Sequence, residues 1–162
     1  MNAPETTSAG RFLDAVAALL GICTERRYQG EPAMRLEATA ARADPVDLPV
    51  PYADRDGRRV VDVGTLAREL DERSQTHPAA RIAATAQDAL ARGLATIAVD
   101  AAADRGVDVV GFTGGVSYND AISRRVRTTV ESAGVQYLAQ ERVPPGDAGI
   151  SYGQALVATA RR

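Results

Sequence analysis

The chain lacks several residue types on which common catalytic chemistries depend. It has no lysine, because all 19 of its basic residues are arginines, and it has no tryptophan. Without lysine it can form neither a Walker-type phosphate site nor a Schiff base. The single cysteine, Cys23, excludes an internal disulfide and a cysteine-rich zinc site. The single histidine, His77, excludes any metal site that needs two imidazoles from this chain.

A strong net charge and long apolar runs are absent as well. The formal charge is −2 and the arginines are spread along the chain, so nucleic acid is not expected as a partner. No apolar run approaches the length of a membrane span, and the first residues lack the features of a signal peptide. We therefore expect a cytoplasmic protein with no membrane contact. The length of 162 residues, with 45% hydrophobic and 25% charged residues, is typical of one globular domain or one lobe of a larger enzyme.

The first half of the chain predicts helices followed by a hairpin. Apolar residues at helical spacing predict helices within about 9–43, the first capped by Thr7 or Ser8. Over residues 46–52, apolar residues alternate with polar residues or prolines, which predicts an edge strand. A turn and a valine-rich return strand then complete a hairpin of about 46–63.

The second half predicts alternating helices and strands. Helices of about 64–103 include a long one with apolar residues every three or four positions. The order of the elements predicts an α/β fold, as one domain or one lobe over residues 1–162. The region of about 107–162 is expected to contain a buried strand at 107–112, a helix at 119–133, a strand at 135–138 and a last helix at 147–160.

The strongest local feature is a strand that runs into two glycines and then a helix, in VVGFTGGVSYN at residues 109–119. Such a turn directs unpaired N–H groups and the positive end of a helix to one point, where a phosphate is stabilised. Gly114 and Gly115 allow a ligand to approach the backbone closely. The alternative is a tight structural turn with Asn119 as the helix cap, and spacing alone leaves both open.

A second candidate is Asp147, which follows a Pro-Pro-Gly turn at the start of the last predicted helix. Its carboxylate can ligate a metal or hold a phosphate-bound cation. It can equally cap the helix, since Asp is among the best capping residues. From spacing alone the cap is favoured.

Two further positions have ordinary structural explanations. Asp14 lies three residues after Arg11 on the first helix, a spacing that predicts a weak surface ion pair. Gly30 has the position of a turn glycine. Composition and spacing thus predict an α/β domain with one candidate phosphate site, and they identify no reaction.

Four motifs, read in order, resemble the hydrogenase-maturation carbamoyltransferase (HypF) family. They are AGRFLDAVAALLG at 9–21, YQGEPAM and LEA within 28–38, GGVSYN at 114–119 and VPPGDAGISYGQA at 143–155. The first and last are long enough to be specific. The resemblance implies the second lobe of an actin-like ATPase (ASKHA, ribonuclease H-like) fold, with a mixed sheet and several helices, related to the enzyme that makes threonylcarbamoyladenosine in tRNA.

The resemblance also implies a reaction and its ligands. In that family a carbamoyl group is activated as carbamoyl adenylate and loaded onto the C-terminal cysteine of a HypE-like maturation partner. There it becomes the cyanide ligand of nickel–iron hydrogenase. ATP or carbamoyl adenylate is therefore the implied cofactor of this lobe, together with a divalent metal (Fe, Zn or Mg).

Site residues follow from the matched motifs. Asp147 is the implied metal ligand from this lobe. The family's H-x-x-x-H ligands belong to the first lobe, and this chain cannot complete the metal site because it has only His77. We expect no turnover by the isolated lobe for that reason. The implied nucleotide-binding residues are Gly114, Gly115 and Asn119 at the adenine nucleotide, and Gly30 and Asp14 on the ribose side.

The chain also departs from the family pattern. It has Ala86-Gln87 where the family usually has Phe-His, and Gly146 where the family has asparagine before the metal-binding aspartate. Two alternatives therefore stay open: a non-catalytic assembly module derived from this lobe, or a lobe of a small-molecule O-carbamoyltransferase or a tRNA threonylcarbamoyl transferase. A homo-oligomer is expected if the face that meets the first lobe is uncovered.

Overall fold

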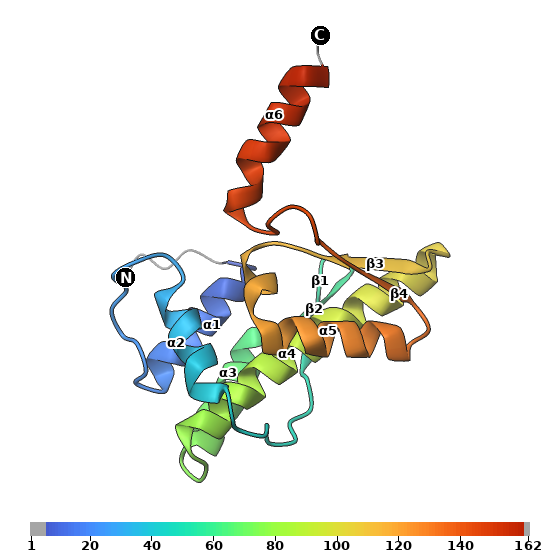
Figure 1. Ribbon diagram of the computed structural model, residues 1–162. Helices are drawn as coiled ribbons and strands as arrows, with labels where there is room; N and C mark the ends of the chain where they lie inside the picture. The colour runs from blue at the N-terminus through green and yellow to red at the C-terminus, as the bar shows by residue number, and fades with distance from the viewer. Residues whose placement is uncertain (1–5, 161–162) are drawn as a thin grey trace.

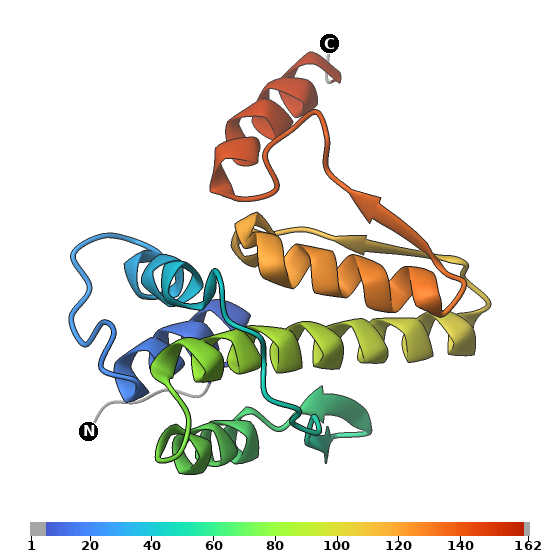
Figure 2. The same ribbon diagram turned by 60° about the horizontal axis from the view of Figure 1, so that its bottom comes forward.

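The computed structural model describes residues 6–160, and its elements form layers around one long helix (Figure 1). Figure 2 shows the layers in order, with α3 and the hairpin on one side of α4 and α5 with the strands β3 and β4 on the other. The helices are α1 (Ala9–Leu19), α2 (Glu31–Ala40), α3 (Val63–Ser74), α4 (Ala79–Arg105), α5 (Asp120–Ser132) and α6 (Ile150–Ala160). The strands are β1 (Tyr52–Arg55), β2 (Arg58–Val61), β3 (Val109–Phe112) and β4 (Gln136–Ala139), and short 3-10 turns are η1 (Gly115–Tyr118) and η2 (Asp147–Gly149).

Helix α4 is the centre of the fold because its alanine-rich surface lets several neighbours approach at once. It has 27 residues, and α1, α2, α3, α5 and β2 all pack against it. Ile82 and Leu90 of its predicted apolar stripe are buried, and so is Ala86 between them. Gly93 lies where the hairpin approaches most closely, because a Cβ there would lie 2.7 Å from a methyl group of Val61. Small side chains on α4 therefore set the spacing of the layers.

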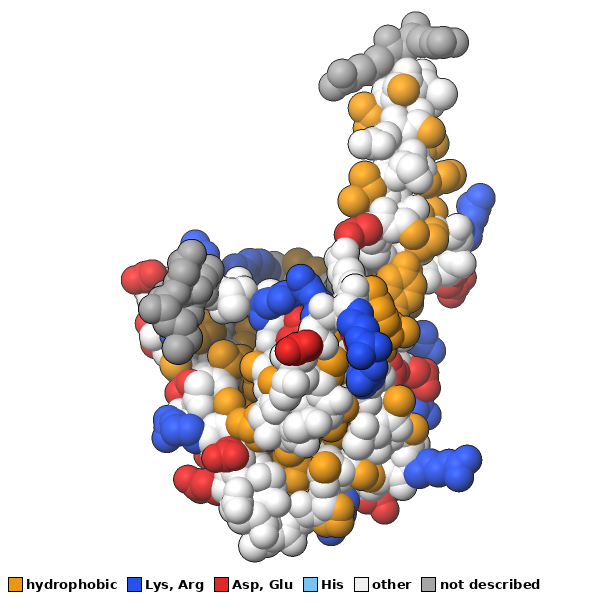
Figure 3. Space-filling model, turned by 90° about the vertical axis from the view of Figure 1, so that its left-hand side faces the viewer, with side chains coloured by type: hydrophobic (Ala, Val, Ile, Leu, Met, Phe, Trp, Pro, Cys, Tyr) orange, Lys and Arg blue, Asp and Glu red, His pale blue; other side chains and the backbone are white. Residues whose placement is uncertain are grey.

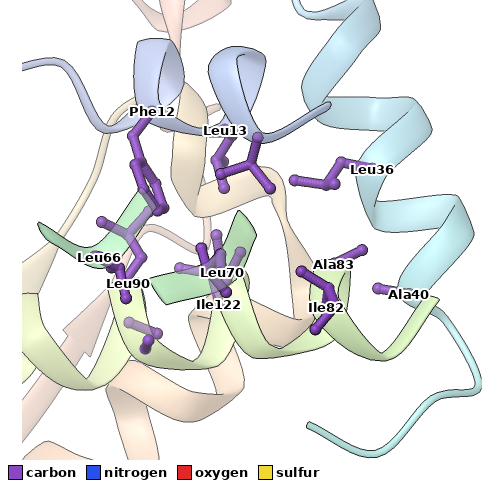
Figure 4. Packing of buried hydrophobic residues seen from close by; sticks show 14 of the residues in the cluster. Phe12, Leu13, Leu36, Ala40, Leu66, Leu70, Ile82, Ala83, Leu90 and Ile122 are labelled. Carbon is purple, nitrogen blue, oxygen red and sulfur yellow. The ribbon is translucent and has the colours of Figure 1, made fainter. Parts of the chain in front are cut away.

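The hydrophobic core is filled by aliphatic side chains from the first four helices and α5. Figure 4 shows Phe12 and Leu13 of α1 and Leu36 of α2 meeting side chains of α3 and α4. Leu66 and Leu70 of α3 are completely buried there. Burying an aliphatic side chain of this size contributes about 1.5–3 kcal/mol relative to leaving it exposed. The core therefore extends to both sides of α4, because the buried side chains of α5 lie on the side of β3 and β4.

The predicted α/β fold class is confirmed, and the strands form two separate two-stranded sheets in the part of the chain described. β1 and β2 form an antiparallel hairpin, and β3 and β4 are a parallel pair joined by α5. Asp56 and Gly57 make the hairpin turn, both with positive φ (54° and 73°), as the two-residue turns that match strand twist require. Parallel and antiparallel pairing thus both occur, but not in one sheet.

The predicted strand over 46–52 is wrong for most of its length. Residues 46–51 are assigned to no strand, and β1 begins at Tyr52. The prolines at 49 and 51 have no N–H to donate to a ladder. The segment is held by α4 instead, because the Val46 N–H donates to the Thr85 hydroxyl (2.8 Å) and Arg92 donates to the Leu48 carbonyl (2.7 Å). Alternation here marks an extended segment packed on a helix, with Leu48 completely buried.

One other expectation is corrected and two are confirmed. β3 was expected to be buried, but its residues are half-buried or exposed, because α4 and α5 cover only one side of the strand pair. The helix expected at 119–133 is α5, and the 3-10 turn η1, which begins at Gly115, precedes it. Ser8 caps α1 as predicted, its hydroxyl accepting from the Arg11 N–H at 3.3 Å.

Helix α6 projects from the body and has no buried residue (Figures 1 and 3). Residues 148–160 carry no charged side chain, and large apolar residues lie about half exposed along the helix. Figure 3 shows hydrophobic side chains distributed along it. Among the described residues, no helix is long and apolar enough to span a membrane. The large exposed apolar residues of α6 are Ile150, Tyr152, Leu156 and Val157.

Candidate functional site

Two loops that carry the strongest sequence motifs lie side by side. We call residues 113–118 the glycine loop and residues 144–147 the aspartate turn. The Gly114 N–H donates to the Pro145 carbonyl at 2.8 Å, and the Thr113 hydroxyl donates to the same oxygen at 3.2 Å. The loops are joined across 32 residues of sequence, as the Thr113–Pro145 bond shows. The fold therefore brings the candidate phosphate site and the candidate metal ligand together.

The glycine loop presents free backbone donors. Gly114 has φ 99° and ψ 175°, a conformation suited to glycine, and its carbonyl accepts from the Ser117 N–H at 3.0 Å and the Ser117 hydroxyl at 2.7 Å. The N–H groups of Gly115 and Val116 precede the first bond of this turn, so they have no acceptor within it. No heavy atom lies within 4 Å of a Cβ built at Gly114 or Gly115. An anion can approach this backbone without displacing a side chain.

The N-terminus of α5 is not open in the way the sequence suggested. The Asp120 N–H donates to a carboxylate oxygen of Glu37 in α2 at 3.0 Å. The Ile122 N–H donates to the Asn119 side chain at 2.9 Å, and the Ser123 N–H to the Asn119 carbonyl. The protein's own groups therefore occupy this helix end, and the free donors lie in the 3-10 turn before it.

Asn119 acts as the cap that spacing suggested, and it has a second partner that the sequence did not reveal. It is 7% exposed, and its amide donates to the side-chain oxygen of Gln87 at 2.7 Å. Gln87 is 2% exposed on α4 and donates in turn to the Ala83 carbonyl at 3.1 Å. Since each amide has a hydrogen-bond partner, the Asn119 side chain connects α4 to α5. Its proposed contact with a nucleotide remains a prediction.

Asp147 is exposed at the start of η2, beside the glycine loop. A carboxylate in this position suits a hard divalent cation, which takes oxygen ligands. It can supply only one or two of the six or more oxygens that such a cation binds. No cluster of three or more His, Cys, Asp or Glu residues occurs within residues 6–160. Asp147 therefore fits one ligand position of such a cation, which needs further oxygen ligands beside it.

Asp14 lies on α1 and Gly30 directly precedes α2, at one end of the lobe. Asp14 is on α1, which packs against η1, and it pairs with Arg11 at 3.2 Å as predicted. Gly30 precedes α2 with φ 82°. The loop before it is held by Glu31, which accepts from the Arg27 N–H at 2.6 Å and pairs with Arg35 at 2.7 Å. α1 therefore contacts the glycine loop through η1, and Gly30 has the conformation of a turn glycine.

The bond from the Arg27 N–H is the main reason that the pKa of Glu31 lies below its usual value, with burial opposing it and the charge of Arg35 adding to it. Glu31 is 1% exposed. A carboxylate so placed stays ionised and holds the loop that carries Gly30.

A cleft of about 470 Å³ lies elsewhere, between α2, α4 and α5. Small apolar residues line much of it, and four of its charged residues form ion pairs. Arg125 pairs with Asp88, and Arg124 pairs with Asp120 at 2.9 Å. The Glu37 carboxylate accepts from the Asp120 N–H, and the two motif loops remain the candidate site.

Comparison with known proteins connects these loops to one family. Residues 1–154 match the family model described as "Carbamoyltransferase, Kae1-like Domain, second subdomain". The chain belongs to this family. The probable carbamoyltransferase HypF of Methanocaldococcus jannaschii is 38% identical over 156 residues, 96% of this chain and 20% of that protein. The chain thus spans about a fifth of the length of this curated relative.

Solved structures agree with the family in fold. HypF of T. kodakarensis matches 93% of this chain and 19% of its own, with a TM-score of 0.83 and 37% identity. A full-length HypF in the phosphate- and nucleotide-bound form also has a TM-score of 0.83, with 30% identity over 93% of this chain and 20% of that one. The chain therefore has the fold of the Kae1-like second subdomain of this carbamoyltransferase family.

Three residues with a structural role at the site were missed by sequence reasoning. Gln87 had a detectable signal, because it is the one amide in an alanine-rich helix face that is otherwise apolar. Glu37 and Tyr118 had none, because their partners lie far away in the sequence. Glu37 meets the start of α5, and Tyr118 meets Gly146 in the aspartate turn.

Proposed function

We propose that this chain is the nucleotide-binding lobe of a carbamoyltransferase of hydrogenase maturation. The observation that carries this proposal is the hydrogen bond from the Gly114 N–H to the Pro145 carbonyl, which unites the two motif loops. Membership of the family and the likeness to a HypF structure that holds phosphate and nucleotide support the same reading. The proposed ligand is ATP or carbamoyl adenylate.

In this proposal each loop has its own task. The free N–H groups that follow Gly114 donate to a phosphate oxygen of the nucleotide, and Gly115 has no side chain in its way. Asn119 faces the adenine nucleotide, and Asp14 and Gly30 line the ribose side. Asp147 supplies one oxygen ligand to a divalent metal (Fe, Zn or Mg) whose other ligands lie in the first lobe, and the bound metal balances phosphate charge.

The proposed acceptor of the carbamoyl group is the C-terminal cysteine of a HypE-like partner. The rest of the active site belongs to the portion of the longer relatives that this chain does not span. We propose that this portion also covers α6, whose apolar side chains are exposed. The isolated lobe is accordingly expected to turn over no carbamoyl phosphate.

The proposal is tested by placing residues 1–162 in a full-length relative and enlarging one glycine. Gly115→Val inserts a side chain where the phosphate is expected, and Gly111→Val is the matched control. Neither glycine has a positive φ, and a Cβ at either meets nothing within 4 Å. We expect Gly115→Val to weaken ATP binding by calorimetry about tenfold or more, a loss of about 1.4 kcal/mol, and to reduce carbamoyl transfer, with Gly111→Val close to wild type.

Equal effects of the two variants on ATP binding would contradict the proposed phosphate site. Unchanged affinity and activity in both would favour the alternative, a non-catalytic assembly module that has kept the fold of the lobe.

A further inference from the structure

Gly146 in the aspartate turn is a glycine for a reason that its backbone does not explain. Its φ of −103° and ψ of −157° are extended values that any residue adopts. A Cβ at this position would lie 2.7 Å from the Cε2 atom of Tyr118, closer than such contacts occur. The ring of Tyr118, in the position that it takes here, therefore leaves no room for a side chain at residue 146.

Tyr118 contacts the aspartate turn with both its ring and its hydroxyl. The ring covers Gly146, and the hydroxyl oxygen accepts from the Gly146 N–H at a long 3.4 Å. The side chain is nevertheless 56% exposed. An aromatic ring left half in solvent gains little from burial, so its contact with Gly146 is not the by-product of a packed core.

The base of the Tyr118 side chain is fixed by its own loop. The preceding Ser117 is held at both ends, since its N–H and hydroxyl donate to the Gly114 carbonyl and its carbonyl accepts from the Ser123 hydroxyl at 2.7 Å. The following Asn119 N–H donates to the Val116 carbonyl at 3.1 Å. The ring thus extends from a braced 3-10 turn.

The aspartate turn is consequently held at two points. On one side the Pro145 carbonyl accepts from the glycine loop, and on the other the ring of Tyr118 lies against Gly146. Asp147 follows Gly146 directly, and among the described residues its side chain makes no hydrogen bond or ion pair with the glycine loop. Its position relative to Gly114 and Gly115 is therefore set through its neighbours.

We propose that Tyr118 is a positioning residue that fixes the Asp147 carboxylate relative to the glycine loop, and that Gly146 is the residue which admits its ring. The positioning role rests on the proposed function, because it matters only if nucleotide and metal bind together at these loops. Its structural part, the coupling of Tyr118 to Gly146, stands independently of that function.

The structural part is tested with the 162-residue chain in a double-mutant cycle. The variants are Tyr118→Ala, Gly146→Ala and the two combined, and the readout is the amide chemical shifts of Asp147 and Gly114 by NMR. Gly146→Ala is expected to shift both amides strongly in the wild-type background and weakly in the Tyr118→Ala background, because the clashing ring is gone. If Gly146→Ala does not fold, recovery of the folded spectrum in the combined variant is expected for the same reason.

Shifts from Gly146→Ala that are equal in both backgrounds would overturn the coupling. Failure of Tyr118→Ala to restore a Gly146→Ala chain that does not fold would overturn it too. Gly111→Ala, a glycine with open space around it, is the control for adding a methyl group outside the two loops.

The positioning role is tested by ATP titrations with and without Mg²⁺. We expect Tyr118→Ala to leave the dissociation constant for ATP alone unchanged. The increase in ATP affinity that Mg²⁺ provides should fall about tenfold, the size of effect that groups orienting a metal ligand have. Tyr118→Phe keeps the ring and should keep most of that gain. An equal loss with and without Mg²⁺ would overturn the positioning role. Absence of ATP binding by the wild type would contradict the proposed function instead, and the NMR cycle would still decide the coupling.

Discussion

At the scale of single residues, the buried carboxylate of Glu31 makes stability depend on pH. Its pKa is lowered from the usual 4.5, chiefly by the bond from the Arg27 N–H. A lowered folded-state pKa means that the ionised form is stabilised by folding, so the contribution is fully present above pH 4.5 and is lost as pH falls through the folded value. The stability of the loop that carries Gly30 therefore depends on pH through Glu31.

We expect Glu31→Gln to unfold at lower urea concentration than wild type at pH 7. The difference between the two should shrink as pH falls below 4.5, because protonated Glu31 resembles glutamine. Urea titrations followed by circular dichroism between pH 3 and 7 measure this, with the exposed Glu72→Gln as control. A difference that stays constant over this range would contradict the assignment. Asp62 adds to the acid sensitivity of both proteins, because the Thr65 N–H lowers its pKa.

At the scale of elements, the contact between the hairpin and α4 depends on Gly93. A Cβ there would lie 2.7 Å from one methyl group of Val61 and 3.0 Å from one of Val50. Alanine improves helix propensity by up to about 1 kcal/mol. Overpacking a close contact costs about 1–3 kcal/mol. The two effects oppose each other, and the stiffness of the β-branched valines favours the cost.

We therefore expect Gly93→Ala to destabilise the fold and Val61→Ala combined with it to recover part of the loss. Thermal or urea unfolding measures both. Gly64→Ala in α3 is the matched control, since its Cβ would make only an ordinary contact at 3.5 Å and the substitution should be neutral or stabilising. A Gly93→Ala protein at least as stable as Gly64→Ala would show that the hairpin does not press on α4 in solution.

At the scale of the whole molecule, the uncovered helix α6 predicts self-association of the 162-residue chain. Leu156 and Val157 are 52% and 54% exposed, and no charged residue interrupts the helix. Exposed apolar surface of this kind marks an interaction site or causes association. Sedimentation experiments should show an average mass that rises with concentration, and Leu156→Gln with Val157→Gln should reduce the rise. The control is Ala155→Gln with Thr159→Gln on the same helix. A monomer at all concentrations would contradict this expectation.

The sequence by itself determined the local features of this protein. The Ser8 cap and the periodicity of α4 were predictable because each depends on residues close together in the chain. The family resemblance was predictable for the same reason, since it rests on contiguous motifs. These motifs also named Gly114 and Asp147 as site residues, whose roles remain predictions.

Only the tertiary structure decided how these local pieces meet. Residues 46–51 alternate as a strand does, yet they belong to neither sheet, and side chains of α4 hold them instead. Gln87 and Asn119 form one pair across 32 residues, and Tyr118 meets Gly146 across 28. Such contacts depend on the packing of α4, α5 and the loops in three dimensions, which sequence spacing does not encode. In this chain without lysine, the candidate phosphate site consists of backbone N–H groups of the glycine loop, which the fold brings beside the aspartate turn.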